Sequence, residues 1–130
     1  MDIPNGEKPV YSAVHFVGEV RNAFKGTDGI FVDCLFSKMT LEGAFMDMAS
    51  FVRCRFEDVD FYWGHFFKTR FVGCRFERVG FQGANLTDCA FVDCELINCD
   101  FGKDNLGADT DCSSCRWIHS QIRDCKGLSR

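Results

Sequence analysis

The sequence lacks the features expected of a membrane, secreted or nucleic-acid-binding protein. Charged residues interrupt every hydrophobic stretch, so no run of about 18 apolar residues is available to cross a bilayer. The segment 1–9 has no basic stretch followed by an apolar one, and we therefore expect no secretory signal and a cytoplasmic location. The net charge of -4 argues against a nucleic-acid partner, because phosphate contacts need a basic surface.

The composition also limits the fold and the cysteine chemistry. A chain of 130 residues is short enough to form a single domain. Its nine cysteines are an odd number, and in a reducing compartment they are expected to be free thiols with no disulfide scaffold. Among the aromatic residues, 15 are Phe and only 2 each are Tyr and Trp. This bias suggests that Phe has a repeated structural role.

Large apolar residues recur at every fifth position from residue 31 to residue 106. Eleven of the 15 Phe lie in this register, where one fifth of them, three, would fall by chance. We expect these residues to form the core. The eleven are Phe31, Phe36, Phe51, Phe56, Phe61, Phe66, Phe71, Phe76, Phe81, Phe91 and Phe101, and the register is completed by Leu41, Met46, Leu86, Leu96 and Leu106.

Small residues precede most of these large ones by two positions, as in Cys54 before Phe56 and Ala84 before Leu86. Residues two apart in an extended segment point to the same side, so each unit of five has one small and one large residue inside. A long helix cannot keep such a stripe, because a step of five residues turns about 140° around its axis. The period therefore predicts extended structure.

A second period of twenty residues contains the period of five. The segments FVDCLF, FVRCRF, FVGCRF and FVDCEL begin at residues 31, 51, 71 and 91. Four units of five then make one turn of a square coil, and successive turns stack through backbone hydrogen bonds about 4.8 Å apart. The sequence thus predicts an all-β fold, a β-solenoid of about five coils with twenty residues per coil.

The units CRFED, CRFER, ANLTD and CDFGK resemble the repeats of the pentapeptide-repeat proteins, in which a small residue stands two before a central Leu or Phe. The resemblance covers residues 29–108 without a gap. It implies a right-handed quadrilateral β-helix, and the handedness comes from the resemblance alone.

The two ends follow the pattern less closely. We expect a flexible N-terminus over 1–9 and an irregular coil or cap over 10–28, although apolar residues at 13, 17, 20 and 24 also permit a short helix ending at Gly26. Residues 109–130 are expected to form the last coil and a C-terminal cap, with the register shifted by one residue. Either end could be covered by dimerisation, because an open coil exposes apolar core and unpaired backbone groups.

The cysteines near the C-terminus are the one candidate metal site. Cys112, Cys115, His119 and Cys125 have a spacing that could surround zinc. A pentapeptide coil, however, distributes such residues over different sides, so we expect no metal and no cofactor. We also expect no catalytic site, because an interior filled with Phe leaves no pocket and the three His have no partner at a recognisable spacing.

Apolar residues at outward positions are the candidate binding site, because the pattern otherwise places polar residues there. They gather in the middle of the repeat region, and we expect them to contact a partner: Tyr62, Trp63, His65 and Phe67, with Phe45 and Met48 one turn below. The alternative is that they are surface residues with no role in binding.

A column of valines, Val32, Val52, Val72 and Val92, occupies one outward position of successive turns. It is explained either by β-propensity on a flat face or by self-association. A homodimer is therefore the second interaction that we consider.

Together these features predict a non-catalytic protein-binding module that acts through outward aromatic residues. The resemblance extends to small bacterial pentapeptide-repeat proteins, some of which act beside toxins, and so implies an immunity-type role with a protein partner. The same resemblance brings an alternative, mimicry of DNA to bind gyrase as in quinolone-resistance members. A structural scaffold is the third alternative. Neither a nucleic acid nor a membrane is expected as a partner.

Overall fold

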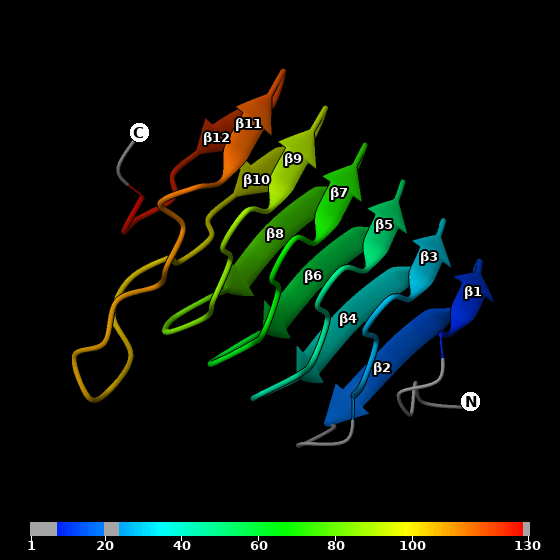
Figure 1. Ribbon diagram of the computed structural model, residues 1–130, viewed down its shortest axis with the longest axis horizontal. Coiled ribbons are helices and arrows are strands. Elements are labelled where there is room, and N and C mark those ends of the chain that lie inside the picture. The colour runs from blue at the N-terminus through cyan, green and yellow to red at the C-terminus, as the bar shows by residue number, and fades with distance from the viewer. Residues whose placement is uncertain (1–7, 20–23, 129–130) are drawn as a thin grey trace.

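The computed structural model describes residues 8–19 and 24–128, which wind into a square β-solenoid (Figure 1). Two parallel six-stranded sheets run along it, in the orders β1-β3-β5-β7-β9-β11 and β12-β10-β8-β6-β4-β2. Phe31 pairs with Phe51, and Phe51 pairs with Phe71, so one coil takes twenty residues. The predicted all-β solenoid of about five coils is confirmed.

The two sheets form two of the four sides. The first face carries β1 (Val10–Ser12), β3 (Ile30–Val32), β5 (Ser50–Val52), β7 (Arg70–Val72), β9 (Ala90–Val92) and β11 (Arg116–Ile118). The second face carries β2 (His15–Glu19), β4 (Leu35–Thr40), β6 (Arg55–Asp60), β8 (Arg75–Gly80), β10 (Glu95–Ile97) and β12 (Gln121–Arg123). The third face, around Phe61 and Phe81, and the fourth face, around Met46 and Phe66, are joined by isolated bridges such as Gly80–Asp100 and Phe45–His65.

The corners between faces need tight turns. Among the described residues, fifteen other than glycine have a positive φ between 51° and 60°, which is an uncommon conformation for residues with a side chain. Backbone bonds to the next coil hold these corners: the amide of Asp33 donates to Val52 O at 2.9 Å, and that of Met48 donates to Phe67 O at 2.8 Å. The corner side chains, including Met48 and Trp63, therefore project from a fixed backbone.

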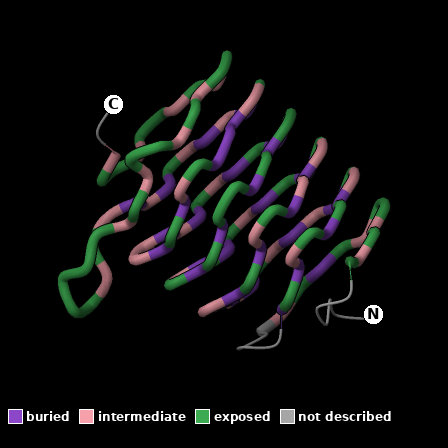
Figure 2. Tube along the Cα trace, in the orientation of Figure 1, coloured by how far each residue is buried: buried purple, intermediate pink, exposed green. Residues whose placement is uncertain are grey.

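Stacked Phe rings fill the interior, and Figure 2 shows the buried positions repeating from coil to coil. All eleven Phe of the register are at most 2% exposed. On the first face the ring centroids of Phe31 and Phe51 are 4.7 Å apart, and the stack continues through Phe71 and Phe91 to Trp117. On the second face Phe56 and Phe76 stack at 4.7 Å. These are the separations at which aromatic pairs stabilise a core.

The small inward position holds thiols that bond to the coil below. Cys54 donates its S–H to Phe31 O at 3.2 Å, and Cys74 and Cys94 make the equivalent bonds to Phe51 O and Phe71 O. Cysteines twenty residues apart therefore form a buried column. Its members are free and act as small core side chains.

The first coil is built from strands, not from the alternative short helix. β1 and β2 pair in parallel with β3 and β4, and the pairing of β2 shifts register between Val17 and Gly18. Residues 20–23 of the proposed helix and the segment 1–7 lie outside the described residues. Within residues 8–19 and 24–128 no helix is long and apolar enough to cross a membrane.

Phe24 and Gly26 exchange the usual order of small and large residues in the first coil. The bridge Lys25–Phe45 aligns Phe24 with Ala44 and Gly26 with Met46, so Phe stands at the small position and Gly at the central one. Phe24 is 1% exposed, and its ring lies 6.3 Å from that of Phe31. At Gly26 an added Cβ would lie 2.9 Å from Met46 Sδ. The Phe24 ring thus fills the space that a central side chain fills elsewhere.

The last coil is longer than the others. β9 pairs with β11 at a spacing of 26 residues, Ala90 with Arg116, so six residues are added to the coil of twenty. The additional residues lie in a loop over 102–109, drawn yellow to orange in Figure 1, which projects from the rod. A coil of 26 residues is one residue longer than five units of five. The five-residue register of the last coil is therefore shifted by one residue, as the sequence predicts.

Leu106 was expected in the core, and this prediction is wrong. It lies at the tip of the loop and is 81% exposed. Cys112 takes the central position instead, because the bridge Asn85–Asp111 places it above Leu86. Beyond Phe101 every described residue is half-buried or exposed, so the last coil forms an open end (Figure 2).

Candidate binding surface

Four of the predicted contact residues lie together on the fourth face. The rings of Phe45 and His65 stack in successive coils, with centroids 4.8 Å apart and planes 6° from parallel. Phe67 is 36% exposed and Met48 49% exposed. We call Phe45, Met48, His65 and Phe67 the aromatic patch.

Rigid backbone supports the aromatic patch. The amide of Phe67 donates to Asp47 Oδ1 at 2.9 Å, and that of His65 donates to Ala44 O at 2.8 Å. The ammonium group of Lys68 lies 5.2 Å from the centre of the Phe67 ring, within the range of a cation–π contact. The aromatic patch is therefore apolar at its centre and has a cationic group at its edge.

Tyr62 and Trp63 were expected to contact a partner, and the structure places them against the loop over 102–109. The Tyr62 hydroxyl donates to Asn105 Oδ1 at 2.7 Å and accepts a bond from the Asn105 amide. The Trp63 indole N–H donates to Asp104 Oδ2 at 2.8 Å. These two residues thus make intramolecular contacts that the sequence pattern did not reveal.

Asp104 organises the loop. Its Oδ1 accepts bonds from the amides of Leu106 at 2.9 Å and Ala108 at 2.8 Å, while its Oδ2 accepts the indole N–H of Trp63. These bonds, that of Trp63 first, lower the pKa of Asp104 below its ordinary value, because they favour the charged carboxylate. Gly83 leaves room for the indole, since a Cβ there would lie 2.7 Å from Trp63 Cδ1.

Replacing Trp63 with Phe should therefore loosen the loop without unfolding the rod. The substitution removes the indole N–H and keeps an aromatic ring. Hydrogen exchange at the amides of Leu106 and Ala108 should become faster, and exchange at the amide of Met48, which bonds within the rod, should not change. Equal exchange at the two loop amides in both proteins would show that the Trp63–Asp104 bond does not hold the loop.

The valine column lies on the first face and continues into the last coil. Val32, Val52, Val72 and Val92 pair in register, and Val92 pairs with Ile118. Val72 is 38% exposed, and the other three valines are half-buried. Self-association through this column stays a prediction.

The four residues considered for zinc do not meet. Cys112 and Cys115 share one corner, with sulfur atoms 2.7 Å apart. His119 Nδ1 lies 3.7 Å from Asp93 Oδ1, and Cys125 bonds to Leu96 O on the second face. In the described part of the chain no group of three or more His, Cys, Asp or Glu side chains is placed to hold a metal ion.

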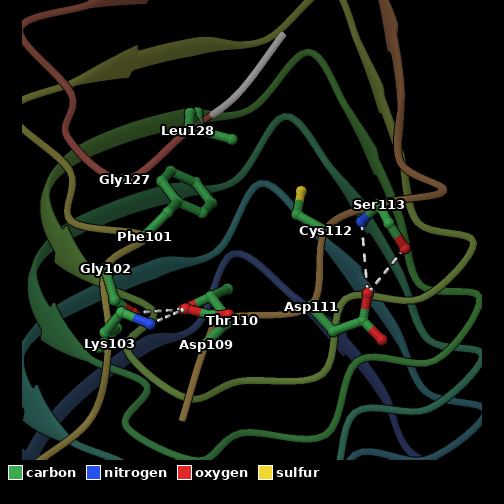
Figure 3. A pocket seen from close by; sticks show the side chains of 10 residues that line it. All are labelled: Phe101, Gly102, Lys103, Asp109, Thr110, Asp111, Cys112, Ser113, Gly127 and Leu128. Atoms are coloured by element: carbon green, nitrogen blue, oxygen red, sulfur yellow. Dashed lines mark hydrogen bonds and ion pairs between the residues drawn. The ribbon is translucent and has the colours of Figure 1, made fainter. Parts of the chain in front are cut away.

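A cleft of about 820 Å³ lies at the open C-terminal end (Figure 3). Its walls include Phe101, Cys112 and Leu128. Lys103 and Asp109, which also line it, pair with each other at 2.7 Å, and Asp111 accepts the hydroxyl of Ser113 at 2.9 Å. The charged groups that line the cleft thus bond to their neighbours.

A family model for pentapeptide repeats matches residues 65–102 with eight copies. Residues 65–102 are thus similar to pentapeptide repeats. The match agrees with the coil of four five-residue units that the structure shows on both sides of that segment. No curated protein matches the sequence.

Two solved structures, one of them titled a pentapeptide repeat protein, match most of this chain at low TM-scores. The protein Rfr23 from the cyanobacterium Cyanothece 51142 is 9% identical, with a TM-score of 0.48, and the match covers 91% of this chain and 87% of that one. Full-length QnrB1, a plasmid-mediated fluoroquinolone resistance protein, is 15% identical with a TM-score of 0.33, and the match covers 89% of this chain and 71% of that one. Such likenesses carry no argument about function.

Ion pairs balance much of the acidic charge along the rod. Most of the pairs join an Arg of one coil to an Asp or Glu of a neighbouring coil, so the negative charge of these carboxylates is balanced locally. Four such pairs are Arg53–Asp33 at 2.8 Å, Arg78–Asp58 at 2.5 Å, Arg75–Glu95 at 3.1 Å and Arg123–Glu95 at 2.7 Å. The guanidinium of Arg78 also lowers the pKa of Asp58. The first and second faces therefore do not present a continuous stripe of unpaired carboxylates.

Proposed function

We propose that this protein is a non-catalytic binding module whose aromatic patch contacts a protein partner. The observation that carries the proposal is the position of the aromatic patch, in the second and third coils of the fourth face. The equivalent outward positions of later coils are polar, namely Asn85, Thr87 and Asp111. Aromatic side chains gathered in the middle of a surface are those that dominate binding energy at interfaces.

The repeat backbone supports this proposal through its rigidity. A patch held by coil-to-coil hydrogen bonds loses little conformational entropy when a partner binds, so more of the contact energy appears as affinity. Lys68 at the edge favours a partner that presents an acidic group beside an apolar one. The specific form that we favour is an immunity-type role, in which the partner is a protein toxin or effector.

An affinity capture tests the proposal. The tagged wild-type protein and the Phe45→Ala/Phe67→Ala variant are expressed in the native cell, and bound proteins are identified by mass spectrometry. The variant should bind the captured partner about 30-fold more weakly, which corresponds to about 2 kcal/mol, the threshold of an interface hot spot. Its thermal stability should change little, because both side chains are exposed.

The matched control is Val72→Ala/Ile118→Ala, which removes two exposed apolar side chains from the first face. It should retain the partner. If the control loses the partner and the patch variant retains it, the valine column is the interface. If both variants bind the partner as the wild type does, the aromatic patch does not contribute to binding, and the scaffold alternative gains support.

The same experiment addresses the DNA-mimic alternative. A gyrase subunit in the wild-type sample, displaced by added duplex DNA, would replace our proposal with gyrase binding. We favour a toxin or effector over gyrase because mimicry needs a strong negative field, and Arg side chains pair with many of the acids.

A further inference from the structure

Cys112 and Cys115 occupy the corner of the last coil, and this corner is a β-turn. The amide of Cys115 donates to Cys112 O at 3.3 Å, which closes a turn of four residues. The first and last Cα atoms of a β-turn lie less than about 7 Å apart, and disulfides join Cα atoms separated by about 4.4 to 6.8 Å. The backbone therefore suits a bond between these two residues.

The side chains are also placed for this bond. Their sulfur atoms are 2.7 Å apart, with the S–H of Cys112 directed at Cys115 Sγ, and a small movement would bring them to the bond length of about 2.05 Å. From this geometry we infer that Cys112 and Cys115 form a reversible disulfide, a redox site at the open end of the solenoid.

The surroundings allow a small oxidant to reach the pair. Both residues are half-buried, whereas Cys34, Cys54, Cys74, Cys89, Cys94 and Cys99 are buried. Cys112 lines the cleft of about 820 Å³, which is open to solvent at the end of the rod. Figure 3 shows its sulfur in the space between Phe101 and Ser113. An oxidant of the size of a small disulfide can therefore contact this pair and not the buried column.

The two thiols also differ in acidity, and thiol–disulfide exchange needs one of them as a thiolate. The S–H of Cys112, which is directed at Cys115 Sγ, lowers the pKa of Cys115, because a donor stabilises a thiolate. The Cys115 thiolate is thus the nucleophile, and Cys112 follows as the resolving thiol.

The oxidant is a low-molecular-weight disulfide of the glutathione class. The Cys115 thiolate attacks one sulfur of the small disulfide, forms a mixed disulfide and expels one small thiolate. Cys112 then loses its proton and attacks Cys115 Sγ, forming the internal bond and expelling the second small thiolate. Two protein thiols are oxidised and one small disulfide is reduced to two thiols.

The test titrates the reduced, folded protein with oxidised glutathione, blocks the remaining thiols and digests the chain with trypsin. Cleavage after Lys103 and Arg116 leaves Cys112 and Cys115 alone together in one peptide, 104–116, and places Cys89 in another, 79–103. The peptide 104–116 should lose two hydrogen atoms. Half-oxidation should need at least about tenfold less oxidised glutathione in the folded protein than in the urea-unfolded chain, a shift of roughly 30 mV.

Three variants test the separate roles of the two thiols. Cys112→Ser should stop at a glutathione adduct on Cys115, and Cys115→Ser should not form the internal bond. The matched control, Cys125→Ser, removes another half-buried thiol of the last coil and should oxidise as the wild type does. The inference is wrong if the folded protein keeps both thiols of peptide 104–116 under excess oxidised glutathione, if Cys89 or a second chain is the bonded partner, or if folding gives no advantage.

Discussion

Replacing Phe56 or Phe76 with Ala should lower the free energy of unfolding by about 3 to 5 kcal/mol, as truncation of a buried Phe does. Both rings are fully buried, and they stack on each other at 4.7 Å in the middle of the rod. Neighbouring coils cannot collapse into the space, because backbone bonds fix their spacing. Chemical denaturation followed by circular dichroism measures the effect.

The matched control for these variants is Phe67→Ala, the same substitution at an outward position of the repeat. Phe67 is 36% exposed, so its loss leaves no closed cavity and should cost much less than either core substitution. Equal losses at Phe56 and Phe67 would contradict the assignment of inward and outward positions.

The exchanged pair in the first coil should behave as a coupled unit. Phe24→Ala should cost about 3 to 5 kcal/mol because Gly26 has no side chain to fill the cavity. Gly26→Leu should cost about 1 to 3 kcal/mol because the new side chain meets Met46 and Phe31 while Phe24 still occupies the space.

The double variant Phe24→Ala/Gly26→Leu restores the usual order, with the small residue two before the large one. It should be more stable than the sum of the single changes predicts, by at least about 1 kcal/mol. Denaturation of the four proteins in this cycle measures the coupling. Additive effects would show that Phe24 and Gly26 do not share one space.

The sequence predicts the interior almost completely, because a five-residue period is a local property. Each Phe of the register has a small residue two positions before it and an equivalent residue twenty positions away, and these relations suffice to place Phe51 on Phe71. The column of Cys54, Cys74 and Cys94 follows in the same way. Corner geometry and ring stacking add detail but do not change this arrangement.

The departures from the period could not be predicted in the same way. Leu106 fits the period by its residue type, yet the loop carries it into solvent. Gly102, Asp104, Asn105 and Gly107 are turn-forming residues and are the one signal that could have located the loop. The contacts of Tyr62 and Trp63 join residues more than 40 positions apart, and no short-range pattern encodes them.

The exchange of Phe24 and Gly26 is one reason why the first coil follows the five-residue period less closely. A count of every fifth residue meets Gly26 where a large side chain is expected. The volume is nevertheless supplied two residues earlier, by a ring that packs against Phe16, Phe31 and Phe36. The Phe24 ring therefore fills the interior of the first coil, although the order of small and large residues is reversed there.

Site-specific photo-crosslinking in the native cell tests the role of the fourth face most directly. A benzophenone amino acid replaces Phe67 in the aromatic patch and, in a parallel strain, Val72 on the first face. Our account predicts that the probe at position 67 forms an adduct with one other protein species and that the probe at 72 does not. Adducts at 72 without any at 67, or the same adducts at both positions, would contradict the proposal that the aromatic patch is the binding surface.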